Sequence, residues 1–386
     1  MAEGWVRLLA RADGLAQVAR VEVPYVSLPA QMRRIKAELM AAIERVLEDG
    51  RYVLGPDVEE FEQRFADYVG TKYAVGVGNG TSALVLSLRS IGIGRGDEII
   101  TAPNSFVASA ACSALLGATP VFVDVRETDM NIDPDLIENG ITKRTRAIVP
   151  VHLAGHPAEM DALLAIAARH NIPVIEDAAQ SVGSMYHGRR TGSMGLTGCF
   201  SLHPLKNLHA YGDAGVVTTN DESVYNWIMK ARNHGLRTRD QAEFWSCNSR
   251  LDTIQAAILN VKLNYLDQWT NERRLLANQY RREMSQVVQV PEEAADCFHT
   301  YQTYVIKATR RTDLLDHLHA LGVQATVHYP LPIHLQEAAQ SLHLRKDDFP
   351  VASSLADRIV SLPLFPEMTV AQRTAVIEGV RSFYEC

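Results

Sequence analysis

Residues 73–91 read YAVGVGNGTSALVLSLRSI and combine a short apolar run, a glycine-rich turn and a longer apolar stretch. The first five residues are typical of a buried strand, and the stretch after Thr81 is typical of a helix. A strand that leads through glycines such as Gly80 into a helix start offers backbone N–H groups and a helix dipole to an anion, most naturally a phosphate. The alternative is that Thr81 or Ser82 only caps the helix. The turn is not a dinucleotide fingerprint, because Thr81 stands where the third glycine of GxGxxG belongs.

The same alternation of short apolar runs and helical stretches continues along the chain. An amphipathic helix that Gly70 ends precedes the first run, and further runs follow at residues 98–102, 120–125, 147–153, 173–177, 199–203 and 215–219. Strands that alternate with helices predict an α/β fold with a mostly parallel sheet covered on both faces. In such sheets, ligands bind beyond the carboxyl ends of the strands.

The pattern changes after Leu266, where a long charged helix leads into a smaller α+β unit. We therefore expect an N-terminal extension at residues 1–24, a large domain at residues 25–266 and a small C-terminal domain at residues 267–386. Because no Gly/Ser-rich linker separates the two domains, we expect them to share an interface and a cleft.

Composition excludes several classes of protein. The chain has 386 residues, 47% of them hydrophobic, and a formal net charge of -7, which argues against nucleic-acid binding. The five cysteines form no CxxC pair, so the sequence predicts neither a metal site nor a disulfide framework, and a reducing cytoplasm fits. Charged residues interrupt the N-terminal stretch, which therefore does not resemble a signal peptide, and no later segment is apolar over the roughly 20 residues that a membrane span needs.

Two acidic residues end the apolar run of IPVIEDAAQSVG, at residues 172–183. Successive side chains on a strand face opposite sides, so either Glu176 or Asp177 can point into a site while the other points away. A carboxylate at this end of a parallel strand favours a functional role, with a helix cap as the alternative. Gln180 follows one turn later.

A lysine without charged neighbours lies in FSLHPLKNLHAYGDAG, at residues 200–215. Taken alone, Lys206 fits a side chain whose apolar stem is covered while its amine reaches solvent. Together with the phosphate turn and the strand-end carboxylate it describes a site for pyridoxal 5'-phosphate (PLP). This cofactor needs an anion pocket for its phosphate, a carboxylate for its pyridine nitrogen and a lysine for its aldehyde carbon.

With these residues in place, the chain resembles the DegT/DnrJ/StrS family of PLP-dependent sugar aminotransferases of fold-type I. The resemblance extends from about Tyr25 to the C-terminus and rests on motifs that include GPDVEEFE, NGTSAL, VHLAGHPAEMD, IEDAAQSVG, SLHPLKNLHAYGDAG, RNHGL, NSRLD and HYPLP.

The resemblance implies a role for each matching residue. It makes Lys206 and Asp177 the catalytic pair and assigns the remaining cofactor contacts to Gly80, Thr81, Ser82, Phe106, Gln180, Ser201 and Asn248. Asn248 corresponds to a phosphate ligand from a second subunit, which implies a homodimer with shared active sites. Positions near the sugar are Arg250, His328 and Tyr329, for which an interface ion pair and a buried turn are the alternatives.

The resemblance further implies that an amino group passes from L-glutamate or glutamine to a nucleotide-linked ketosugar in amino-deoxysugar biosynthesis. The GDAG turn after the lysine favours a dTDP-3-keto-6-deoxyhexose over a 4-keto sugar. A sugar dehydratase, whose relatives carry His at the position of Lys206, and a non-catalytic PLP-binding regulator are further alternatives. Of three departures from the family pattern, Leu202 and Cys247 are interpreted as packing changes, whereas Ala154 is expected to widen the substrate side of the cleft.

Overall fold

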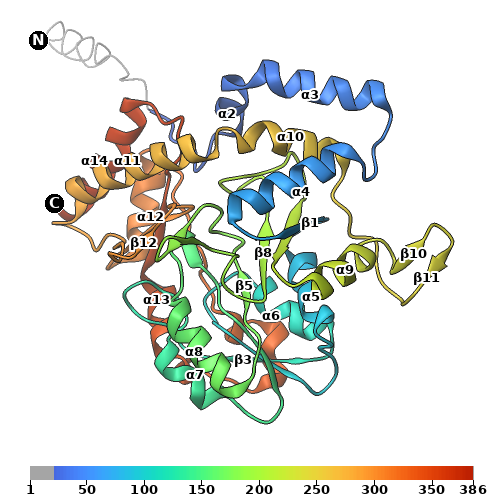
Figure 1. The fold of residues 1–386 in the computed structure, drawn as a ribbon. Coiled ribbons are helices and arrows are strands. Elements are labelled where there is room, and N and C mark those ends of the chain that lie inside the picture. The colour runs from blue at the N-terminus through green and yellow to red at the C-terminus, as the bar shows by residue number, and fades with distance from the viewer. Residues whose placement is uncertain (1–20, 386) are drawn as a thin grey trace, which may run out of the picture.

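The main sheet brings together the strands that alternate with helices in the sequence (Figure 1). The computed structural model describes residues 21–385, so the predicted extension lies outside the described residues apart from residues 21–24. One ladder has the order β1-β9-β8-β5 and the other the order β3-β2-β4. Parallel bridges from Ile148 to Val174 and from Val151 to Asp177 join β4 to β5 and so connect the two ladders. The strands are β1 (Tyr73–Val77), β2 (Glu98–Thr101), β3 (Thr119–Phe122), β4 (Thr145–Val149), β5 (Ile175–Asp177), β8 (Thr197–Ser201) and β9 (Gly215–Thr219).

All neighbouring strands of this sheet run parallel except those that flank β9, which is antiparallel to both β1 and β8. The predicted mostly parallel α/β sheet is therefore confirmed. Alternation on β9 shows that both faces are covered: Val216 packs with Phe61 and Phe65, whereas Val217 packs with Leu84 and lies in a different cluster. A strand buried on both faces reads as a continuous apolar run, which is why the sequence revealed it.

Helices cover the two faces and surround the sheet. They are α4 (Pro56–Val69) and α10 (Thr253–Leu263) in one cluster, α5 (Gly80–Ser90), α6 (Ala108–Leu115) and α9 (Glu222–Ala231) in another, and α7 (Pro134–Gly140) and α8 (Met160–His170) near β3 and β4. Local signals set their ends. Pro56 opens α4, Gly70 closes it in the left-handed conformation, and the Asp221 side chain accepts the N–H groups of Ser223 and Val224 at the start of α9.

The C-terminal third forms its own apolar cluster around a two-stranded ladder, visible at the left of Figure 1 as α11, α12 and α14. Its elements are α11 (Leu266–Met284), β13 (Tyr304–Lys307), α12 (Arg311–Ala320), β14 (Ile359–Leu362) and α14 (Val370–Glu385). Val23 is buried in the same cluster and pairs with Val323. The division at residues 24/25 and 266/267 stays a proposal.

The C-terminal third contacts the main sheet at the start of α13 (Pro350–Arg358), among other places. The carboxylate of Asp124, just after β3, accepts the backbone N–H groups of Val351 and Ala352 at 2.9 Å each. The first turn of a helix has unpaired N–H groups and a positive dipole end, so a carboxylate stabilises it. The apolar cluster that surrounds β2 and β3 continues into α13 through Phe349.

The remaining elements complete the structure. They are α2 (Leu28–Arg34), α3 (Lys36–Asp49), β6 (Met185–Tyr186), β7 (Arg189–Arg190), β10 (Leu236–Thr238), β11 (Gln241–Ala242), β12 (Cys297–Phe298) and the 3-10 turns η1 (Leu153–Gly155), η2 (Ile333–Leu335), η3 (Glu337–Leu342) and η4 (Lys346–Asp348). Figure 1 shows the β10–β11 hairpin extending from the body of the molecule. Among residues 21–385, no helix has the length and apolar content needed to cross a membrane.

A buried ion pair connects helix α4, strand β1 and the residue that follows α9. Glu62 of α4 accepts the N–H of Gly76 in β1 at 2.7 Å and pairs with Arg232, which follows α9. Arg232 also donates to the carbonyl oxygen of Gly76 at 2.9 Å. Both charged side chains are almost fully buried, so each depends on the other for its solvation.

We expect Arg232→Ala to destabilise the sheet by about 3–5 kcal/mol, because it leaves the carboxylate of Glu62 buried without its partner. The measurement is the urea midpoint of the transition that unfolds the sheet. As a control, Arg381→Ala breaks an exposed pair with Glu385 and should change stability by less than about 0.5 kcal/mol. Equal effects of the two variants would contradict this account.

Candidate active site

The two acids that end β5 have separate tasks. Glu176 turns away from the cleft, and its carboxylate accepts hydrogen bonds at 2.6–3.0 Å from the ring of His152 and from the backbone N–H groups of Gly192, Met194 and Gly195. These bonds satisfy a fully buried charge and connect β5 to the loop before β8. Glu176 is therefore a structural residue.

Asp177 points to the other side of β5 and is only 4% exposed. Ser109 of α6 donates its hydroxyl to Oδ2 at 2.7 Å, and the N–H of Ala179 donates to Oδ1 at 3.2 Å. Burial raises the pKa of Asp177, while the Ser109 hydroxyl and the nearby charge of Lys206 act in the opposite direction. A carboxylate held in this way attracts a positively charged or protonated partner.

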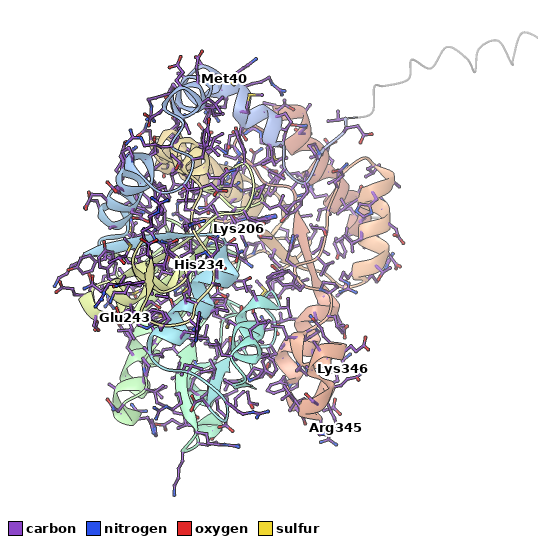
Figure 2. All side chains as sticks on the ribbon, turned by 90° about the vertical axis from the view of Figure 1, so that its right-hand side faces the viewer. Met40, Lys206, His234, Glu243, Arg345 and Lys346 are labelled. Atoms are coloured by element: carbon purple, nitrogen blue, oxygen red, sulfur yellow. The ribbon has the colours of Figure 1, made fainter. Side chains whose placement is uncertain are left out.

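Lys206 lies on the loop between β8 and β9, and Figure 2 shows it near the middle of the molecule, between the sheet and the C-terminal third. Burial lowers the pKa of Lys206 to about 8, and the negative charge of Asp177 limits that fall. A substantial share of this amine is therefore neutral near pH 8, as a nucleophile or a base requires.

The start of α5, where the sequence predicts an anion site, closely approaches the end of β8. A Cβ atom on Gly80 would lie 2.7 Å from Cβ of Ser201, so only glycine fits where α5 meets the end of β8. The helix cap is Asn79, whose side chain accepts the N–H of Ser82 at 2.8 Å. Thr81 and Ser82 lie in the first turn of α5, so the alternative that one of them provides the cap is wrong.

A second group of predicted residues is joined by contacts among its members. Gln180 accepts the N–H of Ala154 at 2.8 Å and donates to the hydroxyl of Tyr329 at 3.3 Å. The ring of Tyr329 lies 5.8 Å from that of Phe106, measured between centroids. Phe106 itself is 52% exposed.

His328 precedes Tyr329 and lies close enough to Lys206 to interact with its charge. Its Nδ1 lies 3.0 Å from the hydroxyl of Ser361, and its ring lies 5.4 Å from that of Tyr25. Burial and the positive charge of Lys206 lower the pKa of His328 to about 4. The imidazole is therefore neutral at physiological pH and can both donate and accept hydrogen bonds.

Asn248 and Arg250 follow the β10–β11 hairpin and lie beside the glycine turn of the same chain. Between them, Ser249 accepts the N–H of Gly78 through its hydroxyl and its carbonyl oxygen, at 3.2 Å each. Arg250 donates to the side chain of Asn233 at 2.8 Å, and Asn248 is exposed. Within residues 21–385, no hydrogen bond or ion pair joins either side chain to Lys206 or Asp177.

Comparison with known proteins identifies this arrangement. The profile of the DegT/DnrJ/EryC1/StrS aminotransferase family matches residues 33–381. The chain belongs to this family. It is 42% identical to dTDP-3-amino-3,4,6-trideoxy-alpha-D-glucose transaminase of Streptomyces venezuelae over 94% of the chain and 96% of that protein.

The aminotransferase has other relatives of similar length. It is 41% identical to UDP-2-acetamido-2-deoxy-3-oxo-D-glucuronate aminotransferase of Pseudomonas aeruginosa over 90% of the chain and 97% of that protein. The crystal structure of S. venezuelae DesV in complex with a ketimine intermediate superposes with a TM-score of 0.93 at 42% identity, covering 95% of this chain and 99% of that one. The protein is therefore a PLP-dependent sugar aminotransferase of fold-type I.

The residues of the cleft fit this cofactor. The contact of Gly80 with Ser201 leaves backbone N–H groups of α5 available for a phosphate, and buried Asp177 offers a negative charge to a protonated ring nitrogen. Lys206 supplies an amine with a lowered pKa for the aldehyde carbon. Among residues 21–385, no group of His, Cys, Asp and Glu is arranged to hold a metal ion.

Sequence reasoning missed three residues that the structure adds to this site: Asn79, Ser109 and Tyr25. Asn79 precedes a helix and carries a side chain suited to capping, so its position was a usable signal. Ser109 stands in an apolar helix, where its bond to Asp177 could not be read from spacing. Burial raises the pKa of Tyr25 to about 12, and this tyrosine precedes the first recognisable element of the fold.

We expect the rate at which the cofactor-free protein captures PLP to rise with pH around a midpoint near 8, because only a neutral Lys206 reacts. Asp177→Asn removes the negative charge that raises the pKa of Lys206, so its midpoint should fall below that of the parent protein. The measurement is the growth of visible absorbance after mixing at a series of pH values.

An exposed control, Asp313→Asn, should leave the midpoint unchanged. A midpoint near 10.4, the value of an ordinary lysine, would show that Lys206 is not the reacting amine or is not buried.

Proposed function

We propose that this aminotransferase moves an amino group from L-glutamate or glutamine to the keto carbon of a nucleotide-linked sugar, with a dTDP-3-keto-6-deoxyhexose as the favoured acceptor. The observation that carries the proposal is the position of Lys206. Its amine interacts electrostatically with buried Asp177 and with the imidazole of His328, and the start of α5, where Gly80 approaches Ser201, is the segment that we assign to the phosphate.

Each residue has a defined task in this proposal. When bound, PLP supplies an aldehyde that accepts the amino group and a ring that withdraws electrons from the reacting carbon. Lys206 would hold the cofactor through its aldehyde carbon, and the free amine of Lys206 would take a proton from the donor carbon. Asp177 keeps a proton on the ring nitrogen, because its buried negative charge favours the protonated form. The same amine works in reverse when the sugar accepts the amino group.

The lysine also separates this function from the dehydratase alternative. Lys206 is present and burial lowers its pKa, whereas the resemblance implies His at this position in the related dehydratases. A histidine cannot form the covalent link to the aldehyde that returns the cofactor to its resting state. Transamination is therefore the reaction that these residues support best.

The 3-keto acceptor has two supports. The GDAG turn at residues 212–215 follows the lysine, and the relatives from S. venezuelae and P. aeruginosa are named for sugars with the amino or keto group at carbon 3. Those names differ in the nucleotide, so carbon 3 is the better supported part of the proposal. Neutral His328 and the hydroxyl of Tyr329 are the groups we assign to the sugar, beside Ala154 as the small residue that enlarges this side.

Lys206→Ala should lower the turnover number by about 10²–10⁴-fold, because it removes the proton-transferring base and the covalent attachment. The assay uses glutamate or glutamine with a panel of dTDP- and UDP-linked 3-keto and 4-keto sugars. The parent protein should aminate 3-keto sugars fastest, and its visible absorbance should shift when the donor is added. Faster turnover of 4-keto sugars would overturn the proposed acceptor, and normal turnover by Lys206→Ala would overturn the role of the lysine.

We further propose a homodimer in the cytoplasm with shared active sites. The single chain exposes the apolar side chains of Phe106, Leu205 and Tyr211, of which Leu205 adjoins Lys206, and it also exposes Asn248. Apolar side chains exposed beside a polar site are typical of a surface that another subunit covers. The free cysteines Cys112 and Cys199 fit a reducing compartment.

Mixing two inactive variants tests the shared site. Lys206→Ala and Asn248→Ala remove residues that the proposal places in the same site but on different subunits. After unfolding and refolding together, mixed dimers contain one intact site, so activity should recover to roughly a quarter of the parent level. Size-exclusion chromatography checks the assembly, and a failure of mixed dimers to regain activity would overturn the shared site.

A further inference from the structure

A glutamine from the C-terminal third holds the backbone on both sides of Lys206. Gln302 lies between β12 and β13, and its side-chain oxygen accepts the N–H of Asn207 at 2.6 Å. Its side-chain nitrogen donates to the carbonyl oxygen of Leu205 at 2.7 Å. Asn207 and Leu205 are the two residues that flank the lysine, so a single amide group satisfies the backbone before and after it.

These two bonds restrict the direction of the lysine side chain. The Leu205 carbonyl and the Asn207 N–H belong to the two peptide units that meet at Cα of Lys206. When both units are bound to one rigid amide, the backbone dihedrals at Lys206 have little freedom, and the side chain leaves in a fixed direction. A third bond, from the N–H of Lys206 to the carbonyl of His203 at 2.8 Å, completes the loop.

The segment that carries Gln302 is itself firmly attached to the main sheet. On either side of it, the N–H groups of Thr300 and Thr303 donate to the carbonyls of Gly155 and Ala154, at 3.3 Å each. A Cβ on Gly155 would lie 2.5 Å from the hydroxyl of Thr300, which shows how closely the two segments pack. Gln302 therefore connects the backbone around the lysine to the segment after β4. In that segment, the N–H of Ala154 also donates to the side chain of Gln180.

We propose that Gln302 is a positioning residue that aims the amine of Lys206 into the cleft and keeps it away from solvent. The inference rests on the proposed role of Lys206 as the lysine that binds the cofactor. Gln302 acts through the backbone of Leu205 and Asn207. Without it, the loop has more conformations, and the amine spends more time in water.

The chain offers a matched control on the same loop. Gln255 of α10 accepts the N–H of Tyr211 at 2.7 Å and donates to the carbonyl of Tyr211 at 3.0 Å. The side-chain chemistry and the bond pattern are the same as for Gln302, but the bonds hold a residue that does not adjoin Lys206. A general loss of loop stability should therefore follow from either substitution, whereas misplacement of the lysine should follow only from the change at Gln302.

The experiment compares Gln302→Met, Gln255→Met and Lys206→Ala in the full chain. Methionine keeps the length of glutamine and removes both hydrogen bonds. The readouts are the dissociation constant for PLP, from visible absorbance, and the pH midpoint of PLP capture. Gln302→Met should weaken PLP binding about tenfold, as expected for two neutral hydrogen bonds, and should raise the midpoint toward that of a solvated lysine. Gln255→Met should change neither value.

Other results overturn the inference. It fails if Gln302→Met keeps the dissociation constant within twofold and the midpoint unchanged, or if Gln255→Met produces the same shifts. If Gln302→Met does not fold, Gln302→Leu serves instead: its side chain is uncharged and makes neither hydrogen bond, so a raised midpoint and weaker binding are again required. A Lys206→Ala protein that keeps the visible absorbance overturns the proposed function itself, which separates that failure from a failure of the clamp.

Discussion

The active site depends on a carboxylate that does not enter it. Glu176 is fully buried and accepts hydrogen bonds from His152 and from three backbone N–H groups of the loop before β8. A shift of β5 by one residue would exchange the two acids and leave Glu176 without those donors, which would cost several kcal/mol. The register of the strand is therefore fixed by its structural acid, and Asp177 points into the cleft as a consequence.

Burial explains why two basic groups of the cleft are available for chemistry near neutral pH. The pKa of Lys206 falls to about 8 and that of His328 to about 4, in each case mainly because the charged form loses its hydration. The positive charge of Lys206 also disfavours protonation of His328, while Asp177 opposes the fall at Lys206. The site thus contains the carboxylate of Asp177, the amine of Lys206, which changes charge near pH 8, and the imidazole of His328, which does not.

The sequence was sufficient for those features that leave a local pattern. Apolar runs located the strands, and the neighbouring acids at residues 176 and 177 implied that only one faces the cleft. The direction of β9 was not predictable, because a strand buried on both faces has the same composition in either direction. Contacts such as Ser109 with Asp177 or Gln302 with Leu205 join residues far apart in sequence, and spacing contains no information about them. Asn79 was overlooked although its signal was local.

The bond between Asp124 and the start of α13 has a consequence for protein engineering. Exchanging the C-terminal third between relatives is an obvious way to recombine sugar specificities, since residues such as His328 and Tyr329 belong to it. The exchanged segment begins α13 on a carboxylate that the recipient supplies. A chimaera therefore inherits a properly capped helix only when its recipient has an acid after β3, whatever the match between the apolar surfaces.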